Sequence, residues 1–100
     1  MIRGSTPTHR FTPSIDLALV KDIEIVYAQN DIVLITKHLK DCAIEGNTLI
    51  VKLTQEETFK FSHKFAVQIQ ARTLTLDGSV IPTYVTTITV QKCLSSEVLV

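Results

Sequence analysis

The chain has 100 residues, of which 45% are hydrophobic and 20% charged. This length and composition fit one folded domain and exclude an intrinsically disordered chain. Ten Lys and Arg residues balance ten Asp and Glu residues, so no net charge favours nucleic acid or a membrane surface as a partner. No apolar run reaches the roughly 20 residues of a membrane-spanning helix, and the polar N-terminal segment lacks the apolar core of a signal peptide. The mean hydropathy of +0.24, without charge repulsion, favours self-association.

The first half of the chain predicts an irregular lead-in at residues 1–7 followed by short strands. Alternating and β-branched apolar residues mark strand segments at residues 8–12, 23–28 and 32–37, and residues 41–44 are expected to form a short strand or a bridge. Residues 14–20 fit either a helical turn or an extended strand, and we favour a short turn that leads into the next strand. Asn30 and Asp31 tolerate the left-handed conformation of a tight turn, so the second and third segments are expected to form a hairpin.

The middle of the chain predicts a strand followed by one short helix. Residues 48–53 form the fifth strand, with every second side chain apolar and facing inward. Thr54 is followed three residues later by a glutamate, which is the capping-box pattern that starts a helix. We expect this helix near residues 55–60, with its acidic first turn suited to the helix dipole. Phe59 and Phe61 are then expected to close the end of the core.

The last third of the chain predicts two longer strands and a tail. Residues 65–72 alternate most regularly: the inward set is Phe65, Val67, Ile69 and Ala71, and the outward set includes Gln68, Gln70 and Arg72. An Asp-Gly dipeptide at residues 77–78 predicts a tight turn. Residues 83–91 are expected to return as a threonine-rich strand with Tyr84 facing inward. Residues 92–100 form a tail with an apolar end.

About seven short strands, separated by turns at roughly 8–12-residue spacing, predict a single all-β domain over residues 1–100, folded as an antiparallel sandwich. The segment Leu53-Thr54-Gln55-Glu56-Glu57-Thr58, followed by Phe61, resembles the corner of immunoglobulin-type domains. In those domains a brief acidic helical turn follows a strand, and an aromatic residue leads into the penultimate strand. The tryptophan, the cysteine pair between the sheets and the corner tyrosine of antibody domains are missing, so the resemblance implies an Ig-like sandwich and not an antibody-type domain.

A second resemblance covers nearly the whole chain. Its segments are Ile2-Arg3-Gly4-Ser5-Thr6-Pro7-Thr8-His9, Ile25-Val26-Tyr27-Ala28-Gln29, Leu53-Thr54-Gln55-Glu56-Glu57-Thr58 and Val67-Gln68-Ile69-Gln70-Ala71-Arg72. They resemble small proteins encoded among the phage and prophage structural genes of Gram-positive bacteria, and the layout is similar to the Ig-like N-terminal domain of phage baseplate upper proteins. The resemblance implies a virion-associated β-sandwich and implies no catalytic residue.

Residue types that carry catalysis or bind metals are scattered along the chain. His9, His38 and His63 match no zinc-ligand spacing, and we expect solvated or capping roles for them at strand ends and in loops. Cys42 and Cys93 are expected to be free thiols in a reducing compartment, with Cys42 buried and Cys93 the more exposed. A cysteine–histidine nucleophile pair is the enzyme alternative. We favour a protein without catalytic residues, metal, cofactor or small-molecule substrate.

The candidate protein-interface residues are Gln68, Gln70, Arg72, Val98 and Leu99. The first three lie on the outward side of their strand, next to the threonine-rich strand, and form either a plain solvent-facing surface or a flat hydrogen-bonding face that docks another protein. We therefore expect a phage structural or assembly protein of the tail, baseplate or neck. Its partners would be other virion proteins or itself, in the host cytoplasm during assembly and then in the virion. The alternative is a small phage-encoded regulatory or inhibitory module that binds a host protein.

Overall fold

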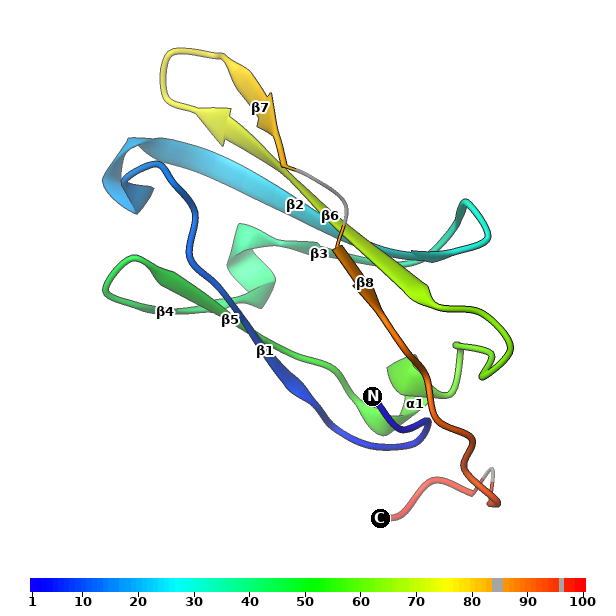
Figure 1. Cartoon of the computed structure of the whole chain (residues 1–100). Helices are drawn as coiled ribbons and strands as arrows, with labels where there is room; N and C mark the ends of the chain where they lie inside the picture. Colours follow the sequence, from blue (N-terminus) through cyan, green and yellow to red (C-terminus); the bar gives the residue numbers. More distant parts are fainter. Residues whose placement is uncertain (84–85, 96) are drawn as a thin grey trace.

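A computed structural model describes residues 1–83, 86–95 and 97–100 and places its strands in two antiparallel sheets (Figure 1). The smaller sheet has the order β1-β5-β4, with β1 (Thr8–Phe11), β5 (Thr48–Lys52) and β4 (Ala43–Glu45). The larger sheet has the order β3-β2-β6-β7, with β8 also paired to β6. Its strands are β3 (Ile32–His38), β2 (Val20–Gln29), β6 (Val67–Thr75), β7 (Val80–Pro82) and β8 (Thr86–Ile88). The predicted all-β sandwich is confirmed.

The order of the strands is that of the immunoglobulin Greek key. In that fold, strands B, E and D share one sheet, and strands C′, C, F and G share the other. The smaller sheet here has the order B-E-D, and the larger sheet begins C′-C-F. Two short strands, β7 and β8, pair one after the other with β6 and together take the place of strand G. The short helix α1 (Gln55–Thr58) joins the E and F strands, where the sequence predicts the corner.

Local side-chain hydrogen bonds start the helical turns. Thr54 Oγ1 accepts the Glu57 N–H at 3.1 Å, and a Glu57 carboxylate oxygen accepts the Thr54 N–H at 3.0 Å, so the predicted capping box is present. The α-helix itself covers only Gln55–Thr58, within the expected residues 55–60. The favoured turn before β2 is the 3-10 helix η1 (Leu17–Leu19), capped by the Asp16 carboxylate. A second 3-10 helix, η2 (Leu39–Asp41), follows β3.

The core lies between the sheets and is centred on Tyr27 of β2. The Tyr27 side chain is fully buried, and its ring centroid lies 6.3 Å from that of Phe61, which is 1% exposed. Tyr27 thus occupies the strand on which antibody domains carry their buried tryptophan. The other fully buried apolar side chains come from β2, β5 and β6 and from the start of the corner: Ile23, Ile25, Leu49, Val51, Leu53 and Val67.

The strands run between two ends of an elongated molecule measuring 47 × 29 × 15 Å. At one end, called here the helix end, α1 contacts residues 1–5 and the loop of residues 59–66 (Figure 1). At the other, called here the turn end, η1 lies beside the turns at residues 46–47 and 76–79. The chain crosses from one end to the other with each long strand.

The prediction that Phe65 lies in the core is wrong, since its side chain is 49% exposed. The buried side chain of Gln29 explains the difference. Its amide nitrogen donates to the Ser62 and Phe65 carbonyls at 2.7 and 2.9 Å. These bonds hold residues 62–65 as a loop, so strand pairing begins only at Val67.

The strand predicted for residues 83–91 is present only as the short strand β8, and a separate strand, β7, precedes it. Residues 80–82 form β7 and residues 86–88 form β8, and the two strands pair with different parts of β6. Between them, Thr83 Oγ1 accepts the Ala71 N–H at 3.0 Å, which takes this donor out of the backbone ladder. Pro82, which has no N–H, ends β7. Tyr84 lies outside the described residues.

Candidate protein-interaction face

The outward side of the larger sheet gathers the predicted β6 residues with neighbours from β2 and β3. Since Ile23, Ile25 and Tyr27 point into the core, the alternate residues of β2 point outward. The paired strands continue this side in three rows, which are Val33-Ala28-Gln68, Thr36-Val26-Gln70 and His38-Glu24-Arg72. These nine residues are called the outer face below.

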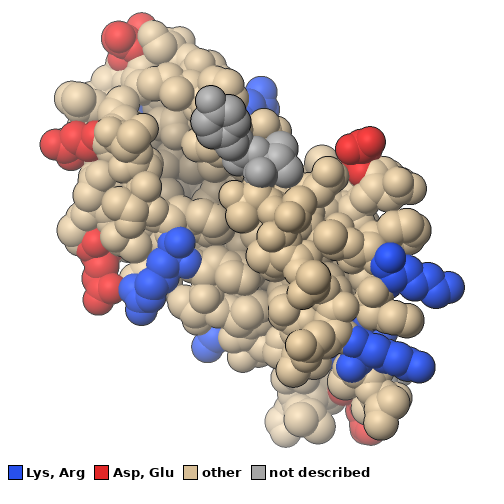
Figure 2. Space-filling view, in the orientation of Figure 1, with Lys and Arg blue, Asp and Glu red and all other residues tan. Residues whose placement is uncertain are grey.

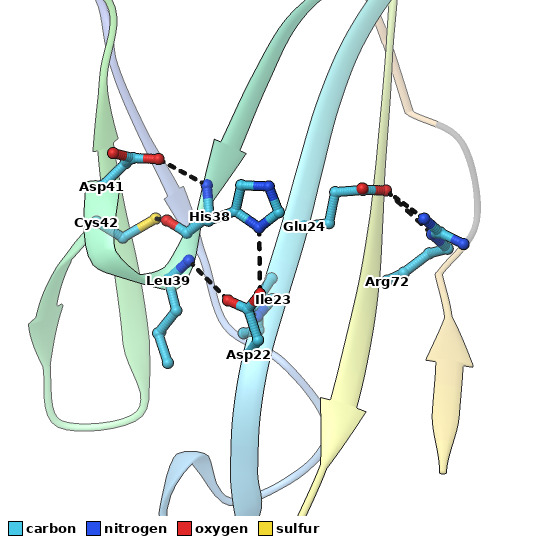
Figure 3. A network of polar contacts seen from close by, with 8 residues as sticks. All are labelled: Asp22, Ile23, Glu24, His38, Leu39, Asp41, Cys42 and Arg72. Atoms are coloured by element: carbon cyan, nitrogen blue, oxygen red, sulfur yellow. Dashed lines mark hydrogen bonds and ion pairs between the residues drawn. The ribbon is translucent and has the colours of Figure 1, made fainter. Parts of the chain in front are cut away.

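One row of the outer face carries its charges as pairs. Arg72 donates from Nε and Nη2 to one Glu24 carboxylate oxygen, at 3.0 and 2.8 Å. In the close view, His38 of β3 points at Asp22 of β2, with 3.2 Å between Nδ1 and the carboxylate oxygen (Figure 3). The positive charge of Arg72 is therefore matched on its own sheet.

The Asp22 carboxylate, beside this row, is held in its ionised form. Partial burial raises the pKa of Asp22, but the N–H groups of Leu39 and Ile23 and the imidazole of His38 lower the pKa by more. The net shift is therefore below the ordinary pKa of an aspartate. An ionised Asp22 fixes the His38 ring and the first turn after β3 in one arrangement.

The other two rows are uncharged. Val26, Ala28, Val33, Gln68 and Gln70 line a shallow hollow of about 210 Å³ together with Asp31, which lies in the turn before β3. Gln70 donates one amide hydrogen to the Thr83 carbonyl at 3.2 Å. The Gln68 side chain makes no hydrogen bond among the residues that the structure describes. Such a surface presents amide donors and acceptors between small apolar groups, and its one charge is the Asp31 carboxylate at the margin.

The rest of the surface is also sparsely charged. In the view of Figure 2, basic and acidic side chains lie mostly toward the margin, and one basic and one acidic group lie side by side at the lower left. Among the described residues, no group of three or more His, Cys, Asp or Glu side chains is placed to hold a metal ion. The described part also has no helix that is long and apolar enough to cross a bilayer.

The tail residues do not belong to the outer face. Val98 and Leu99 lie at the helix end, where the Gln55 amide donates to the Leu99 carbonyl and accepts the Leu99 N–H, both at 2.8 Å. The Leu99 side chain is 77% exposed. The five candidate interface residues therefore form two separate surfaces. Six residues that the interface prediction left out complete the first surface, and only the β2–β3 and β2–β6 registers reveal them: Glu24, Val26, Ala28, Val33, Thr36 and His38.

The histidines and thiols have structural surroundings. His9 lies within β1, not at a strand end or in a loop as predicted, and its Nδ1 is 2.8 Å from the Tyr27 hydroxyl. Burial, and then the N-terminal ammonium, lower the pKa of His9. Cys42 and Cys93 are both half-buried free thiols. Burial, and then Asp41, raise the pKa of the Cys42 thiol, which opposes the thiolate form that a nucleophile needs.

Comparison of the chain with protein-family models, with curated proteins and with solved structures found no match.

Proposed function

We propose that the protein is a non-enzymatic structural or assembly protein of a phage or prophage particle. It would dock onto other particle proteins, or onto copies of itself, through the outer face of its larger sheet. The particle context rests on the resemblance of four sequence segments. The docking mode rests on one observation: two neighbouring rows of the outer face, from β3 through β2 to β6, contain no charged residue.

The chemistry of these rows suits burial against another protein. Interface centres are depleted in charged residues, while the rims remain polar. Gln68 and Gln70 supply hydrogen-bonding groups that cost less to desolvate than a carboxylate or an ammonium. The Glu24–Arg72 pair borders these rows and would orient an incoming partner more than it would strengthen binding. By this proposal the protein works in the host cytoplasm during assembly and then in the particle.

The test is co-purification of the chain with particles, using a variant that charges the outer face. Gln68→Lys with Gln70→Lys places two ammonium groups in the uncharged rows, so we expect loss of the chain from purified particles without loss of folding. Thr8→Lys with Ala43→Lys is the matched control, because both residues are exposed strand positions on the smaller sheet. We expect the control variant to remain with the particles.

Three results would contradict the proposal in different ways. If the natural chain is absent from purified particles, the assignment to the particle is wrong. If the variant with lysines at positions 68 and 70 is still incorporated, the outer face is not the docking surface. If affinity capture recovers one stoichiometric host protein and no particle protein, a host-directed regulatory or inhibitory module is the better description.

A further inference from the structure

The outer edge of β3 is the longest strand edge that the fold leaves open. β3 pairs with β2 on one side, and among the described residues no backbone hydrogen bond from another segment reaches its other side. Only its last residue is engaged locally, since the His38 N–H donates to the Asp41 carboxylate and the His38 carbonyl accepts from the Cys42 thiol. It has seven residues, whereas the other edge strands, β1, β4, β7 and β8, have three or four. Ile32 and Val33 on this edge are 62% and 54% exposed. A long apolar edge of this kind is a template for another strand.

Devices that usually protect an edge are weak on β3. The strand contains no proline, and its one lysine does not guard the edge. Lys37 lies on the core side, where its Nζ is 2.8 Å from a Glu57 carboxylate oxygen and its side chain is 17% exposed. Its charge is therefore engaged within the molecule. An incoming strand would meet Ile32, Val33 and Thr36 and no free ammonium.

A bulge sets the direction of each side chain along β3. The register with β2 shifts between Tyr27 and Ala28, which leaves Leu34 as the extra residue of β3. Val33, Thr36 and His38 face outward with their partners on β2. Leu34 and Ile35 both pack toward the core, and Lys37 faces the same way.

This pattern selects one register for two copies of β3. Directly opposed residues of an antiparallel pair point to the same side of the sheet. Val33 must then face Thr36 of the second copy, which places Leu34 opposite Ile35 and Ile32 opposite Lys37. A shift by one residue in either direction would place core-side residues against outward ones. The bulge is what allows the two strands to match around a two-fold axis.

The same register brings a carboxylate and an imidazole together at both ends of the pair. Asp31, in the turn before β3, comes to lie opposite His38 of the second copy. The two-fold axis repeats this contact, so each imidazole would lie between Asp22 of its own chain and an Asp31 carboxylate. We propose that β3 pairs antiparallel with β3 of a second copy, in the register that joins Val33 to Thr36.

The dimer would join two five-stranded sheets into one continuous sheet, since each β3 closes the open edge of the other. It would also place the two outer faces side by side as a single, larger surface. The inference rests on the proposed function in naming a second copy as one partner of this sheet. It adds the strand, the register and the symmetry of the contact.

Light scattering during size-exclusion chromatography provides the first test. We expect a mass twice the 11.2 kDa of the chain at micromolar concentration. Val33→Lys with Thr36→Lys would place lysines opposite each other twice, so we expect the dimer dissociation constant to rise by roughly tenfold or more. Val33→Glu with Thr36→Lys places opposite charges in the same positions and should restore the dimer. Ile44→Lys on β4, also about half exposed at 52%, is the matched control and should remain dimeric.

Hydrogen exchange of the natural chain gives a second readout that needs no variant. The β3 amides should exchange more slowly at high than at low protein concentration, while the β4 amides should not change. A chain that stays monomeric, or a dimer that survives both lysines at positions 33 and 36, overturns the inference. Failure of the glutamate–lysine variant to restore the dimer overturns the register.

The two proposals fail in different experiments. A monomer that still purifies with particles disproves the β3 dimer and leaves the proposed function standing. A β3 dimer that never enters particles disproves the proposed function and leaves the β3 dimer standing.

Discussion

At the helix end of the sandwich Phe61 and Thr58 are buried, whereas at the turn end Leu19 and Leu76 remain 55% and 64% exposed. Both ends nevertheless have a comparable set of polar contacts. At the helix end, the Gln29 side chain accepts the Ser62 N–H and donates to the Ser62 and Phe65 carbonyls. One amide side chain thus ties a whole loop to the end of β2.

Asn47 holds a loop in the same way at the turn end. Its side chain accepts the Leu17 N–H at 2.8 Å and donates to the Pro13 and Ile15 carbonyls. Hydrogen bonds fix the path of the chain at both ends, while Phe61 is buried at one end and Leu19 and Leu76 are exposed at the other. Since burial supplies most of the stability, Phe61 should contribute more to the free energy of unfolding than Leu19 or Leu76.

Truncating one apolar side chain at each end should give the largest difference in the free energy of unfolding. Phe61→Ala should lower the free energy of unfolding by about 3–5 kcal/mol, because it opens a cavity against Tyr27. Leu76→Ala should change it by only about 0.5 kcal/mol, because most of that side chain is already in water. Urea unfolding at pH 7 measures both. Similar losses for the two variants would refute the contrast between the ends.

Adding one methyl group to a glycine at each end should have a smaller effect. Gly4 has a φ of +78°, and a Cβ there would lie 2.5 Å from the Phe59 ring, against which the Arg3 guanidinium packs at 5.5 Å from the ring centroid. Gly4→Ala should cost about 2–3 kcal/mol, from the strained φ and the clash together. Gly46, with a φ of +60°, has no atom within 4 Å of that position. Gly46→Ala should therefore cost about 1 kcal/mol, from the backbone alone. Thermal unfolding that ranks Gly46→Ala as the more damaging change would argue against a tightly packed helix end.

Removing one ion pair at each end should have the smallest effect on the free energy of unfolding. Burial raises the pKa of Glu57, but the Lys37 ammonium and the Thr54 N–H lower it by more, so the folded pKa lies below the ordinary value of 4.5. The ionised form therefore stabilises the fold above about pH 4.5, and this stabilisation is lost as the pH falls through the folded pKa. Glu57→Gln, which can keep the capping box, should cost about 1 kcal/mol at pH 7 and progressively less in acid.

The turn end supplies the control for this pair. Glu45 and Arg10 have side chains 71% and 61% exposed, so Glu45→Gln should change the free energy of unfolding by less than about 0.5 kcal/mol at any pH. Urea titrations at pH 7 and at about pH 3 compare the two variants. A loss for Glu57→Gln that does not shrink in acid would show that the Lys37 contact is not its cause.

The sequence predicts those parts of the fold that depend on neighbours along the chain. Alternation in residues 48–53 identifies the inward side of β5, and the spacing of Thr54 and Glu57 identifies the start of α1. The Asn30-Asp31 turn is also correct, with both residues at positive φ. In each case the determining contacts lie within about five residues, so the local pattern carries the necessary information.

Contacts between distant segments are not encoded in such patterns. Glu24 and Arg72 are 48 positions apart, and only the register of β2 with β6 brings them together. The same register shows that the outer face includes Val26 and Ala28. Phe65 alternates correctly as a strand residue, yet a buried amide on another strand, Gln29, holds it in a loop. Tertiary hydrogen bonding there overrides local propensity.

The Tyr27 hydroxyl gives the protein an optical signal for the separation of its two sheets. The chain has two tyrosines and no tryptophan, so a Tyr84→Phe variant would contain a single phenol. That phenol belongs to the larger sheet and is bound to His9 of the smaller one, and burial raises its pKa. In an alkaline titration of the variant, phenolate absorbance should therefore appear when the sheets part, and one ultraviolet band would follow the opening of the core without any added label.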